Sequence, residues 1–451
     1  MQVLKLPANL LAPFHSLFPY LQENFTAVRL KFAVIFVGVF WGCAFGLSLR
    51  AQTVPIATTA PGFASVLLHP IDGPTLLPHV PLGGSELEFR FDDLEPGYRT
   101  LGYRLVPCTW DWKREPRLTA GDCIRGFPEL QFPEIVPSFG SRVPYVNYAT
   151  WFPNDMQEFI RSGNYVVEVY DLARPQEILI SRRFVVFEED ATLTVQRLPT
   201  RHIASSRTHQ ELAVTARFGA VRPMDPHRDV HCTVLQNGRW DNALYDWPPR
   251  FVQSDALEYA MEPSALFPGG TTWRAADLKS LRFVSTGIAR IEDDGGTPRF
   301  YLEPAVPRTG APLRAREDLD GRYVIANELR DFHSGSEYVD VRFVLRAPPP
   351  ANTPFPYVYG DFTGGVCSEA WRLSWSSGEG AYVGEFLLKQ GYYEFLFASC
   401  AGPGAPADVT TFEGSHALTD NRYTVLLYVR DLDGRDPVSY THLTLPTKRI
   451  V

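Results

Sequence analysis

Few residues in this sequence have the types and spacing that chemistry requires. His227 and His231 stand four residues apart and Cys232 follows them, a spacing that would suit a metal ion if the segment were helical. Prolines precede the segment and a strand pattern follows it. On a strand, residues four apart share a face but lie about 13 Å from each other. We therefore expect no metal site at this position.

Two Asp-Leu-Asp-Gly segments, at 318–321 and 431–434, resemble the start of a calcium-binding loop. Neither continues to the distal glutamate of an EF-hand, and Asp-Gly pairs are common in solvated turns. The sequence has no Walker loop and no GxGxxG, HExxH or GxSxG motif, and no pair of carboxylates stands out as a general acid and base. It therefore predicts a protein that is not an enzyme and that binds no cofactor or metal.

The composition favours strands over helices. The 451 residues suffice for roughly two to four domains. The chain has 20 Tyr, 30 Phe, 34 Gly and 38 Pro but only 4 Met, a composition typical of aromatic strands joined by turns. The net charge of −8 argues against a nucleic-acid partner, which requires a basic surface.

The N-terminal residues 1–51 read as a targeting segment. Arg29 and Lys31 precede an apolar run from Phe32 to Leu49, and Ala51 follows as a small residue at a cleavage point. This pattern predicts a signal peptide with a long upstream extension. The run is near the lower limit of about 17–25 residues for a spanning helix, so an uncleaved anchor is the alternative. Either predicts an exported protein.

Five cysteines follow the predicted signal segment. An oxidising compartment permits disulfides, and the spacing favours Cys108 with Cys123 and Cys367 with Cys400, which leaves Cys232 alone. Spacing by itself does not decide a pairing, because a disulfide depends on the distance and direction between the two Cβ atoms.

Alternating apolar residues predict an all-β chain, with two to three immunoglobulin-like or early-set β-sandwich domains in tandem after the signal segment. The first domain spans 65–188 and ends in a hairpin. The second spans 191–347 and contains a hairpin turn at Asn237-Gly238. A proline-rich stretch at 347–356 is the clearest boundary, and the third domain spans 357–436.

Residues 437–451 differ abruptly in style from the preceding chain. They closely resemble a peptide that appears when sequencing-adapter DNA is translated at the broken end of an assembled contig. We therefore predict that this tail is not native and that the natural chain continues differently after about Asp436.

The third domain resembles the starch-binding type of early-set sandwich, through a Gly-x-Phe turn at 360–362 and an aromatic strand at 391–397. In sugar-binding members, exposed tryptophans stack on the rings. Trp371 and Trp375 would share one face of a strand, and that face is either a sugar platform or the core. A periplasmic or surface carbohydrate-binding protein is therefore the alternative function.

From about Leu68 to Asp436 the sequence resembles the plug-protein family of the type IX secretion system. Each motif is weak alone, and their order and number carry the resemblance. The motifs are Cys108–Trp112, Gly126-Phe127, Tyr145–Tyr148, Pro153-Asn154, Ser162–Tyr165, Val169-Tyr170, Arg183-Phe184, Val186, His209–Glu211, Gln236–Trp240, Tyr338-Val339, Val341–Phe343, Tyr357–Gly360, Lys389–Tyr393 and Thr419–Tyr423. The run Arg142 to Tyr148 lacks the usual His, and Gly364-Gly365-Val366 replaces a usual Trp.

The resemblance implies a non-enzymatic plug at the periplasmic opening of an outer-membrane β-barrel translocon, which it blocks while no substrate is engaged. It implies a periplasmic location at the inner face of the outer membrane, this translocon as the partner, and no nucleic acid or small-molecule substrate. We expect the contacts to come from long aromatic loops. The candidate contact residues are Trp110, Trp112, Arg142, Tyr145, Tyr148 and Trp240.

Overall fold

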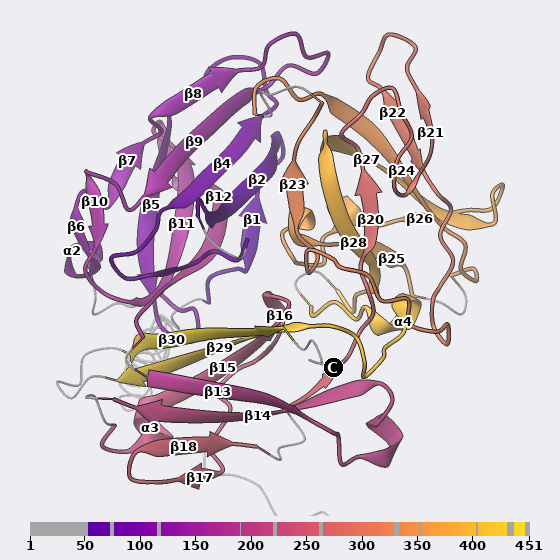
Figure 1. Cartoon of the computed structure of the whole chain (residues 1–451). Helices are drawn as coiled ribbons and strands as arrows, with labels where there is room; N and C mark the ends of the chain where they lie inside the picture. Colours follow the sequence, from indigo (N-terminus) through magenta and orange to yellow (C-terminus); the bar gives the residue numbers. More distant parts are fainter. Residues whose placement is uncertain are drawn as a thin grey trace, which may run out of the picture. The chain divides into compact units, whose positions relative to one another are not determined.

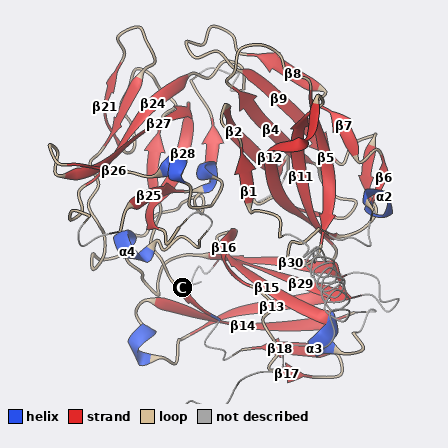
Figure 2. Ribbon diagram, turned by 180° about the vertical axis from the view of Figure 1, so that it is seen from behind, coloured by secondary structure: helices blue, strands red, loops and turns tan. Residues whose placement is uncertain are grey.

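The fold is described from a computed structural model. It covers residues 53–72, 76–114, 119–189, 191–219, 223–260, 265–328, 333–350, 354–402, 405–430 and the backbone of 437–446. These residues form strands with only short helices, which confirms the predicted all-β fold of tandem β-sandwiches (Figures 1 and 2). The predicted signal segment lies outside the described residues. Within the described ranges, no helix is both long and apolar enough to cross a membrane.

The first sandwich contains two large sheets and a small two-stranded sheet. One sheet has the order β2 (Phe63–Pro70), β4 (Leu87–Asp93), β9 (Val146–Phe152), β8 (Glu134–Pro137). The other has the order β1 (Ala57–Thr59), β12 (Arg174–Phe187), β11 (Gly163–Asp171), β5 (Leu101–Cys108), β7 (Glu129–Gln131), with β3 (His79–Pro81) parallel to β12. The two-stranded sheet pairs β6 (Ile124–Gly126), which follows α2 (Ala120–Cys123), with β10 (Gln157–Phe159).

Alternation along β11 decides which side chains enter the core of this sandwich. Tyr165, Val167 and Val169 lie in the core between the two sheets, as their period of two predicts. Val166 points to the opposite face and belongs to a separate apolar cluster. The sheet that contains β11 and β12 is therefore buried on both faces, which explains its continuous apolar runs.

The second sandwich is assembled from two distant parts of the chain. One sheet has the order β13 (Ala191–Leu198), β14 (His209–Phe218), β18 (Ala256–Tyr259), β17 (Phe251–Val252), with β19 (Leu266–Pro268) also on β14. The other has the order β16 (Arg239–Leu244), β15 (Val230–Gln236), β29 (Arg422–Arg430), β30 (Pro437–Pro446), and the short α3 (Pro226–Asp229) precedes β15.

The third sandwich lies between these two parts in the sequence. One sheet has the order β20 (Arg274–Asp277), β28 (Gly391–Ser399), β23 (Tyr323–Ile325), with β25 (Pro356–Tyr359) also on β28. The other has the order β21 (Ile288–Glu292), β22 (Arg299–Leu302), β24 (Tyr338–Leu345), β27 (Ala381–Lys389), β26 (Ser374–Ser376). Single-turn helices η3 (Asp361–Thr363), η4 (Glu369–Trp371) and α4 (Thr410–Glu413) lie in its loops.

The structure corrects the predicted domain boundaries at 191–347 and 357–436. Strands β20 to β24 precede the proline-rich stretch, yet they form the third sandwich together with β25 to β28. Strand β29 follows them but pairs with β15, with Val230 opposite Val429. The proline-rich stretch at 347–356 joins β24 in one sheet to β25 in the other. It is a crossover inside one sandwich, and a proline-rich composition suits such a crossover as well as it suits a linker.

The backbone of 437–446, within the predicted non-native tail, forms β30 antiparallel to β29 at the edge of its sheet. Ladder hydrogen bonds join backbone groups of almost any residue type. The pairing is therefore no test of whether these residues are native, and the foreign origin of 437–451 stays a prediction.

Candidate functional site

The described residues form no cluster of three or more His, Cys, Asp or Glu side chains that could hold a metal ion. His227 lies in α3 and His231 on β15. The His231 ring stacks on Trp110 with 4.1 Å between ring centroids, and its Nδ1 lies 2.8 Å from a carboxylate oxygen of Asp246. What distinguishes this molecule is the way in which its three sandwiches meet.

The first and second sandwiches meet through an apolar junction. Val166 of β11 and Val185 of β12, which point away from the first core, pack against residues of the second sandwich. Those residues are Leu235 of β15 and Leu426 and Tyr428 of β29, which likewise point away from their own core. Two outward sheet faces thus bury each other, and the hydrophobic effect stabilises the contact in proportion to the area removed from water.

Two tryptophans extend this apolar junction. Trp112 of the first sandwich and Trp240 of the second meet edge to face with 4.8 Å between ring centroids. The Arg183 guanidinium lies 4.5 Å from the Trp112 ring and 5.8 Å from the Trp240 ring, and it donates a hydrogen bond to the Val54 carbonyl. Burial lowers the pKa of Arg183, and the two aromatic faces offer its charge a cation–π partner.

The first and third sandwiches meet through a polar junction. The Lys389 ammonium lies 2.7 Å from an Asp92 carboxylate oxygen, and these side chains are 2% and 0% exposed. The Tyr338 hydroxyl donates to the same Asp92 oxygen at 2.7 Å and lies 2.8 Å from the Ser65 hydroxyl. Burial, and then the charge of Asp92, raise the pKa of Tyr338, so this phenol stays protonated and keeps donating.

Tyr145 covers this ion pair. Its ring centroid lies 4.0 Å from the Lys389 ammonium, its hydroxyl donates to the Ser336 carbonyl at 2.8 Å, and its ring meets Tyr338 edge to face. Close by, the Arg142 backbone N–H donates to both carboxylate oxygens of Glu337, at 3.0 and 2.9 Å. The junction is therefore built from charged and polar groups that the two sandwiches satisfy mutually.

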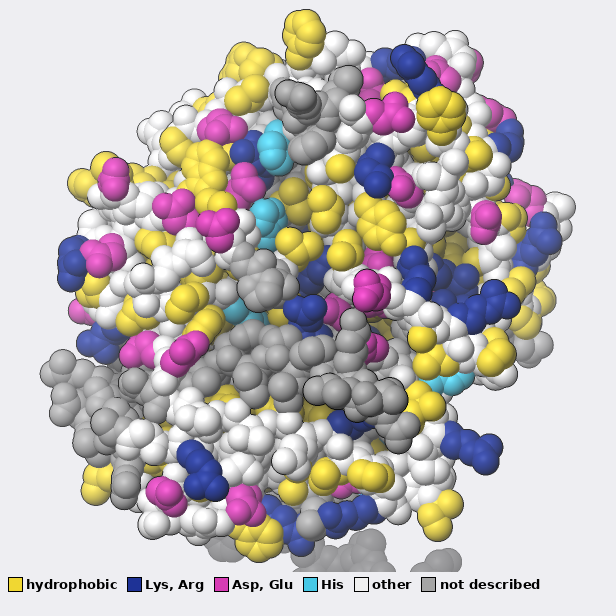
Figure 3. Space-filling model, in the orientation of Figure 1, with side chains coloured by type: hydrophobic (Ala, Val, Ile, Leu, Met, Phe, Trp, Pro, Cys, Tyr) yellow, Lys and Arg dark blue, Asp and Glu magenta, His cyan; other side chains and the backbone are white. Residues whose placement is uncertain are grey.

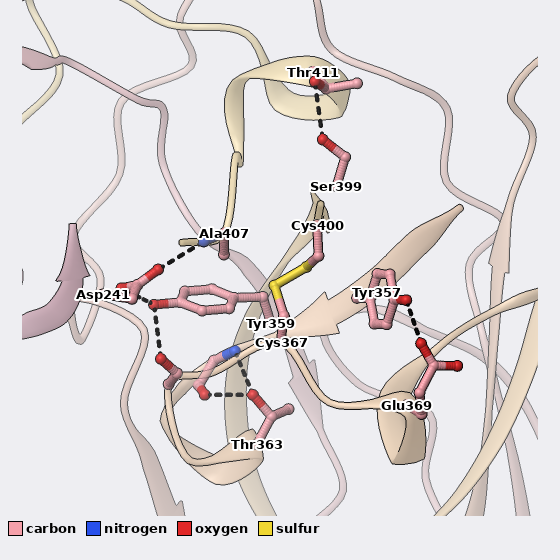
Figure 4. Close-up of a disulfide and its surroundings, with 12 residues drawn as sticks. Asp241, Tyr357, Tyr359, Thr363, Cys367, Glu369, Ser399, Cys400, Ala407 and Thr411 are labelled. Carbon is pink, nitrogen blue, oxygen red and sulfur yellow. Dashed lines mark hydrogen bonds between the residues drawn. A yellow bond between two sulfur atoms is a disulfide. The ribbon is translucent and has the colours of Figure 1, made fainter. Parts of the chain in front are cut away.

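The second and third sandwiches meet beside a disulfide (Figure 4). Asp241 accepts hydrogen bonds from the Tyr359 hydroxyl at 2.8 Å, from the Arg239 guanidinium at 2.8 Å and from the Ala407 backbone N–H at 2.9 Å. Burial acts to raise the pKa of Asp241, but the charge and hydrogen bonds of Arg239 prevail and lower it. Asp241 is therefore a buried, ionised acceptor that joins β16 to two segments of the third sandwich.

Of the two predicted disulfides, the structure contains the one between Cys367 and Cys400, whose Cα atoms lie 6.2 Å apart. It ties the loop after η3 to the end of β28, next to Asp241 (Figure 4). The predicted pair of Cys108 with Cys123 is not formed. Cys108 lies in the apolar junction and Cys123 in the first core, so the two thiols occupy different clusters. Burial raises the pKa of the Cys108 thiol to about 12.

The structure also corrects most of the predicted contact residues. Trp112, Tyr145, Tyr148 and Trp240 have exposed fractions of 1%, 2%, 0% and 9%. They are buried within the molecule and thus offer no surface to another protein. Tyr148 belongs to the first core, where its ring stacks on Phe91.

The two remaining predicted contact residues are partly exposed, yet they too contact a neighbouring sandwich. The Trp110 ring stacks on His231 of the second sandwich. The Arg142 guanidinium pairs with Asp293 of the third sandwich at 2.5 Å and donates to the Gly296 carbonyl at 2.8 Å. Of the six predicted contact residues, only Trp110 and Arg142 are exposed enough to contact another protein. Their contacts within the chain restrict how their side chains can move toward such a partner.

Trp371 and Trp375 do not share one strand. Trp371 ends η4 and packs against Phe362 and Phe386, whereas Trp375 lies on β26 and packs against Tyr382. Both are half-buried against the core of the third sandwich. A flat sugar platform made of these two tryptophans requires that they share one face of a strand. They do not, so this prediction is wrong.

Exposed apolar side chains are found elsewhere on the first sandwich. Phe127 and Met156, joined by a backbone hydrogen bond beside the two-stranded sheet of β6 and β10, are 59% and 51% exposed. Ile135 on edge strand β8 and Phe139 just after it are 40% and 88% exposed. Of these residues only Phe127, as part of Gly126-Phe127, belongs to the family resemblance, because exposure of an apolar residue in an irregular segment has no periodic signal in the sequence.

The fold and its junctions define an all-β scaffold whose distinctive features are contacts between sandwiches. The family model described as "Type 9 secretion system plug protein 1st domain" matches residues 63–188, which are nearly the whole first sandwich. This match supports the predicted resemblance to the type 9 secretion plug family over the first sandwich.

A solved structure shares the fold over most of the chain. It is the crystal structure of a hypothetical protein from Parabacteroides merdae ATCC 43184 at 2.30 Å resolution. The TM-score is 0.82 with 24% identity, and the alignment covers 87% of this chain and 100% of that one. A search of curated proteins gave no match.

Proposed function

We propose that this protein is a non-enzymatic plug that seals the periplasmic opening of the type IX secretion translocon in the outer membrane when no substrate is engaged. The observation that carries the proposal is the family match over residues 63–188. The proposal places the protein in the periplasm at the inner face of the outer membrane, with the β-barrel translocon as its partner.

The junctions between the sandwiches support such a role. A pore wide enough for folded proteins leaks small solutes unless a body of fixed shape fills its opening. An apolar junction and a buried ionic junction hold the first sandwich to its two neighbours. The Asp92 carboxylate of the ionic junction accepts from Lys389 and Tyr338 of the same chain, so this contact does not depend on an external partner.

The contact surface that we propose is the exposed apolar set on the first sandwich, Phe127, Met156, Ile135 and Phe139. A plug must also leave the pore, so its interface should be of moderate size with a polar rim, unlike the core of an obligate dimer. A few exposed aromatic and Met side chains on irregular edges suit such an interface.

The experiment is an affinity purification of the tagged protein from gently solubilised outer membranes, with mass spectrometry of the bound proteins. We expect a very large outer-membrane barrel to co-purify, and less of it when the translocon is loaded with substrate. The variant Phe127→Glu/Met156→Glu should reduce its recovery. The matched control is Phe283→Glu/Val284→Glu, because these residues are exposed to 69% and 58% on the third sandwich, and it should not.

Recovery of the protein without any barrel, in wild type and variants alike, would refute the plug proposal. Equal loss with both double variants would refute the proposed surface but not the function. Nothing in the structure favours the carbohydrate alternative, since Trp371 and Trp375 pack against the core. Retention on a starch gel would nevertheless revive it.

A further inference from the structure

A cavity of about 500 Å³ opens between the two sheets of the third sandwich. Its inner wall is apolar: Phe395 and Phe397 of β28 face Leu302 of β22 and Phe343 of β24. The volume lies within the range of about 300–1,000 Å³ typical of sites for small ligands. The cavity belongs to the third sandwich alone, so an inference from it does not depend on the proposed plug function.

The mouth of this cavity is cationic. Arg274 of β20 and three residues of the loop between β22 and β23, Arg308, Arg314 and Arg316, line it, and Glu303 is the one acidic side chain among the lining residues. On the third sandwich, basic side chains form a visible group in the region of β20 and α4 (Figure 3). This concentration contrasts with the net charge of −8 of the whole chain.

One carboxylate behind the mouth holds two of these guanidinium groups in place. Glu413, which is fully buried, lies 2.9 Å from Arg274 and 2.6 Å from Arg308. Glu394 lies 3.8 Å from Arg316, beyond the distance of a hydrogen bond, and Arg316 donates instead to the Trp273 carbonyl at 2.7 Å. Glu413 thus orients Arg308 and Arg274 from the inner side, and Arg274 also donates to the Val306 carbonyl at 2.8 Å.

Arg308 shows that the cations crowd one another. Its pKa is lowered by burial, Glu413 opposes this shift, and the charges of Arg274 and Arg316 lower the pKa further. Its Nη2 atom is buried and has no hydrogen-bond partner among the described residues. A buried guanidinium N–H without an acceptor is costly, and an anionic oxygen is the partner that satisfies it best.

We propose that this cavity binds a small anionic amphiphile. Its phosphate or carboxylate group would be held by Arg308, Arg314 and Arg316 at the mouth, and its apolar chain would lie between the sheets against Phe343, Phe395 and Phe397. Arginine suits this role because its planar fork binds two oxygens of one anion at once. The apolar wall distinguishes such a ligand from a simple ion.

The test is calorimetric titration of the full chain with n-octyl phosphate, inorganic phosphate and n-octanol as separate probes. We expect n-octyl phosphate to bind with one site per chain, and the other two probes to bind at least about tenfold more weakly, because each lacks one half of the recognised group. Arg314→Gln and Arg316→Gln should each weaken n-octyl phosphate by about tenfold, the usual effect of losing one charged hydrogen bond.

The matched control is Arg282→Gln, an exposed arginine of the same sandwich that does not line the cavity, and it should leave the affinity unchanged. Arg314 is exposed, so its variant should fold even if Arg316→Gln does not. Absence of n-octyl phosphate binding would overturn the proposal. So would equal binding of inorganic phosphate, or an affinity that Arg314→Gln leaves unchanged.

Discussion

The first sandwich meets its two neighbours through junctions of opposite character. Toward the second sandwich it presents Val166, Val185 and Trp112, and the contact is an apolar face against an apolar face. Toward the third sandwich it presents Asp92, whose carboxylate accepts from Lys389 and Tyr338 in a buried network. The first sandwich therefore contacts one neighbour by apolar packing and the other through a buried ionic network.

The two junctions differ in what they contribute to the arrangement of the sandwiches, which is stability in one case and a defined orientation in the other. An apolar face tolerates small shifts, because the hydrophobic effect has no direction. A buried ion pair allows one arrangement, since each displaced charge would lose its partner in a medium that cannot solvate it. We infer that the apolar junction supplies most of the stability and that the polar junction fixes the orientation.

The largest effect is expected from Asp92→Asn, which leaves the Lys389 charge buried beside a neutral amide. Loss of one partner of a buried pair costs about 3–5 kcal/mol, and we expect the free energy of unfolding to fall by that amount. Urea denaturation followed by tryptophan fluorescence measures it. The double variant Asp92→Asn/Lys389→Met should recover much of the loss, and a double variant as unstable as the single one would contradict the assigned role.

The apolar junction should respond differently to its own substitution. Leu235→Ala removes a fully buried side chain between β15 and the first sandwich, with an expected cost of about 2–5 kcal/mol. The cost should be the same at about 0.1 M and 1 M salt, because no charge is involved. Leu235→Met is the control of similar volume, and a cost as large as that of Leu235→Ala would argue against a packing role.

The same chemical change can be made at both junctions. Tyr338→Phe removes a hydroxyl that donates to a carboxylate, and we expect a loss of about 1.5–3 kcal/mol. Tyr428→Phe removes a hydroxyl that donates to the neutral Asn164 amide oxygen, and we expect about 1 kcal/mol. Chemical denaturation of both variants tests the order. A larger loss for Tyr428→Phe than for Tyr338→Phe would mean that the hydrogen bond to Asp92 is not the stronger of the two.

The contribution of a third region, around Glu394, to the free energy of unfolding should depend on pH. In mildly acidic solution, a substitution of Glu394 should change this free energy least. Burial, and then the charge of Asp318, raise the pKa of Glu394 to about 7. A carboxyl group whose pKa is raised on folding favours the folded state while it is protonated, and this contribution is lost as the pH rises through about 7.

The variant Glu394→Gln stays neutral at every pH. We expect its free energy of unfolding to match that of the wild type at about pH 4, to exceed it increasingly as the pH rises to about 7, and to exceed it by a constant amount above that, as measured by urea denaturation across this range. Parallel curves for the two proteins would show that Glu394 does not titrate in this window.

Local pattern predicted the elements of the fold. The alternation at Tyr165, Val167 and Val169 predicted the strand β11 and the face that enters the core. It did not predict the partners of each strand, because the ladder between β15 and β29 joins segments that are almost two hundred residues apart and depends on no local signal. The predicted boundaries of the second and third domains were wrong for that reason.

The prediction that Trp112 and Trp240 contact another protein was wrong for a related reason. Trp112 and Trp240 stand in irregular, aromatic segments, which suit a contact with another protein as well as a contact between domains of one chain. Composition cannot distinguish the two. The cavity of the third sandwich had no signal either, since Arg308, Arg314 and Arg316 are spread over an irregular loop that reads as solvent-exposed charge.

The insertion of the third sandwich into the second has a consequence for how this chain matures. Strands β13 to β19 emerge early during synthesis or export, but the sheet of β15 lacks β29 until the whole third sandwich has followed. During that interval β15 presents an unpaired apolar edge, which is a template for aggregation. We therefore expect the half-emerged chain to need a holding chaperone, and the second sandwich to be the last of the three to close.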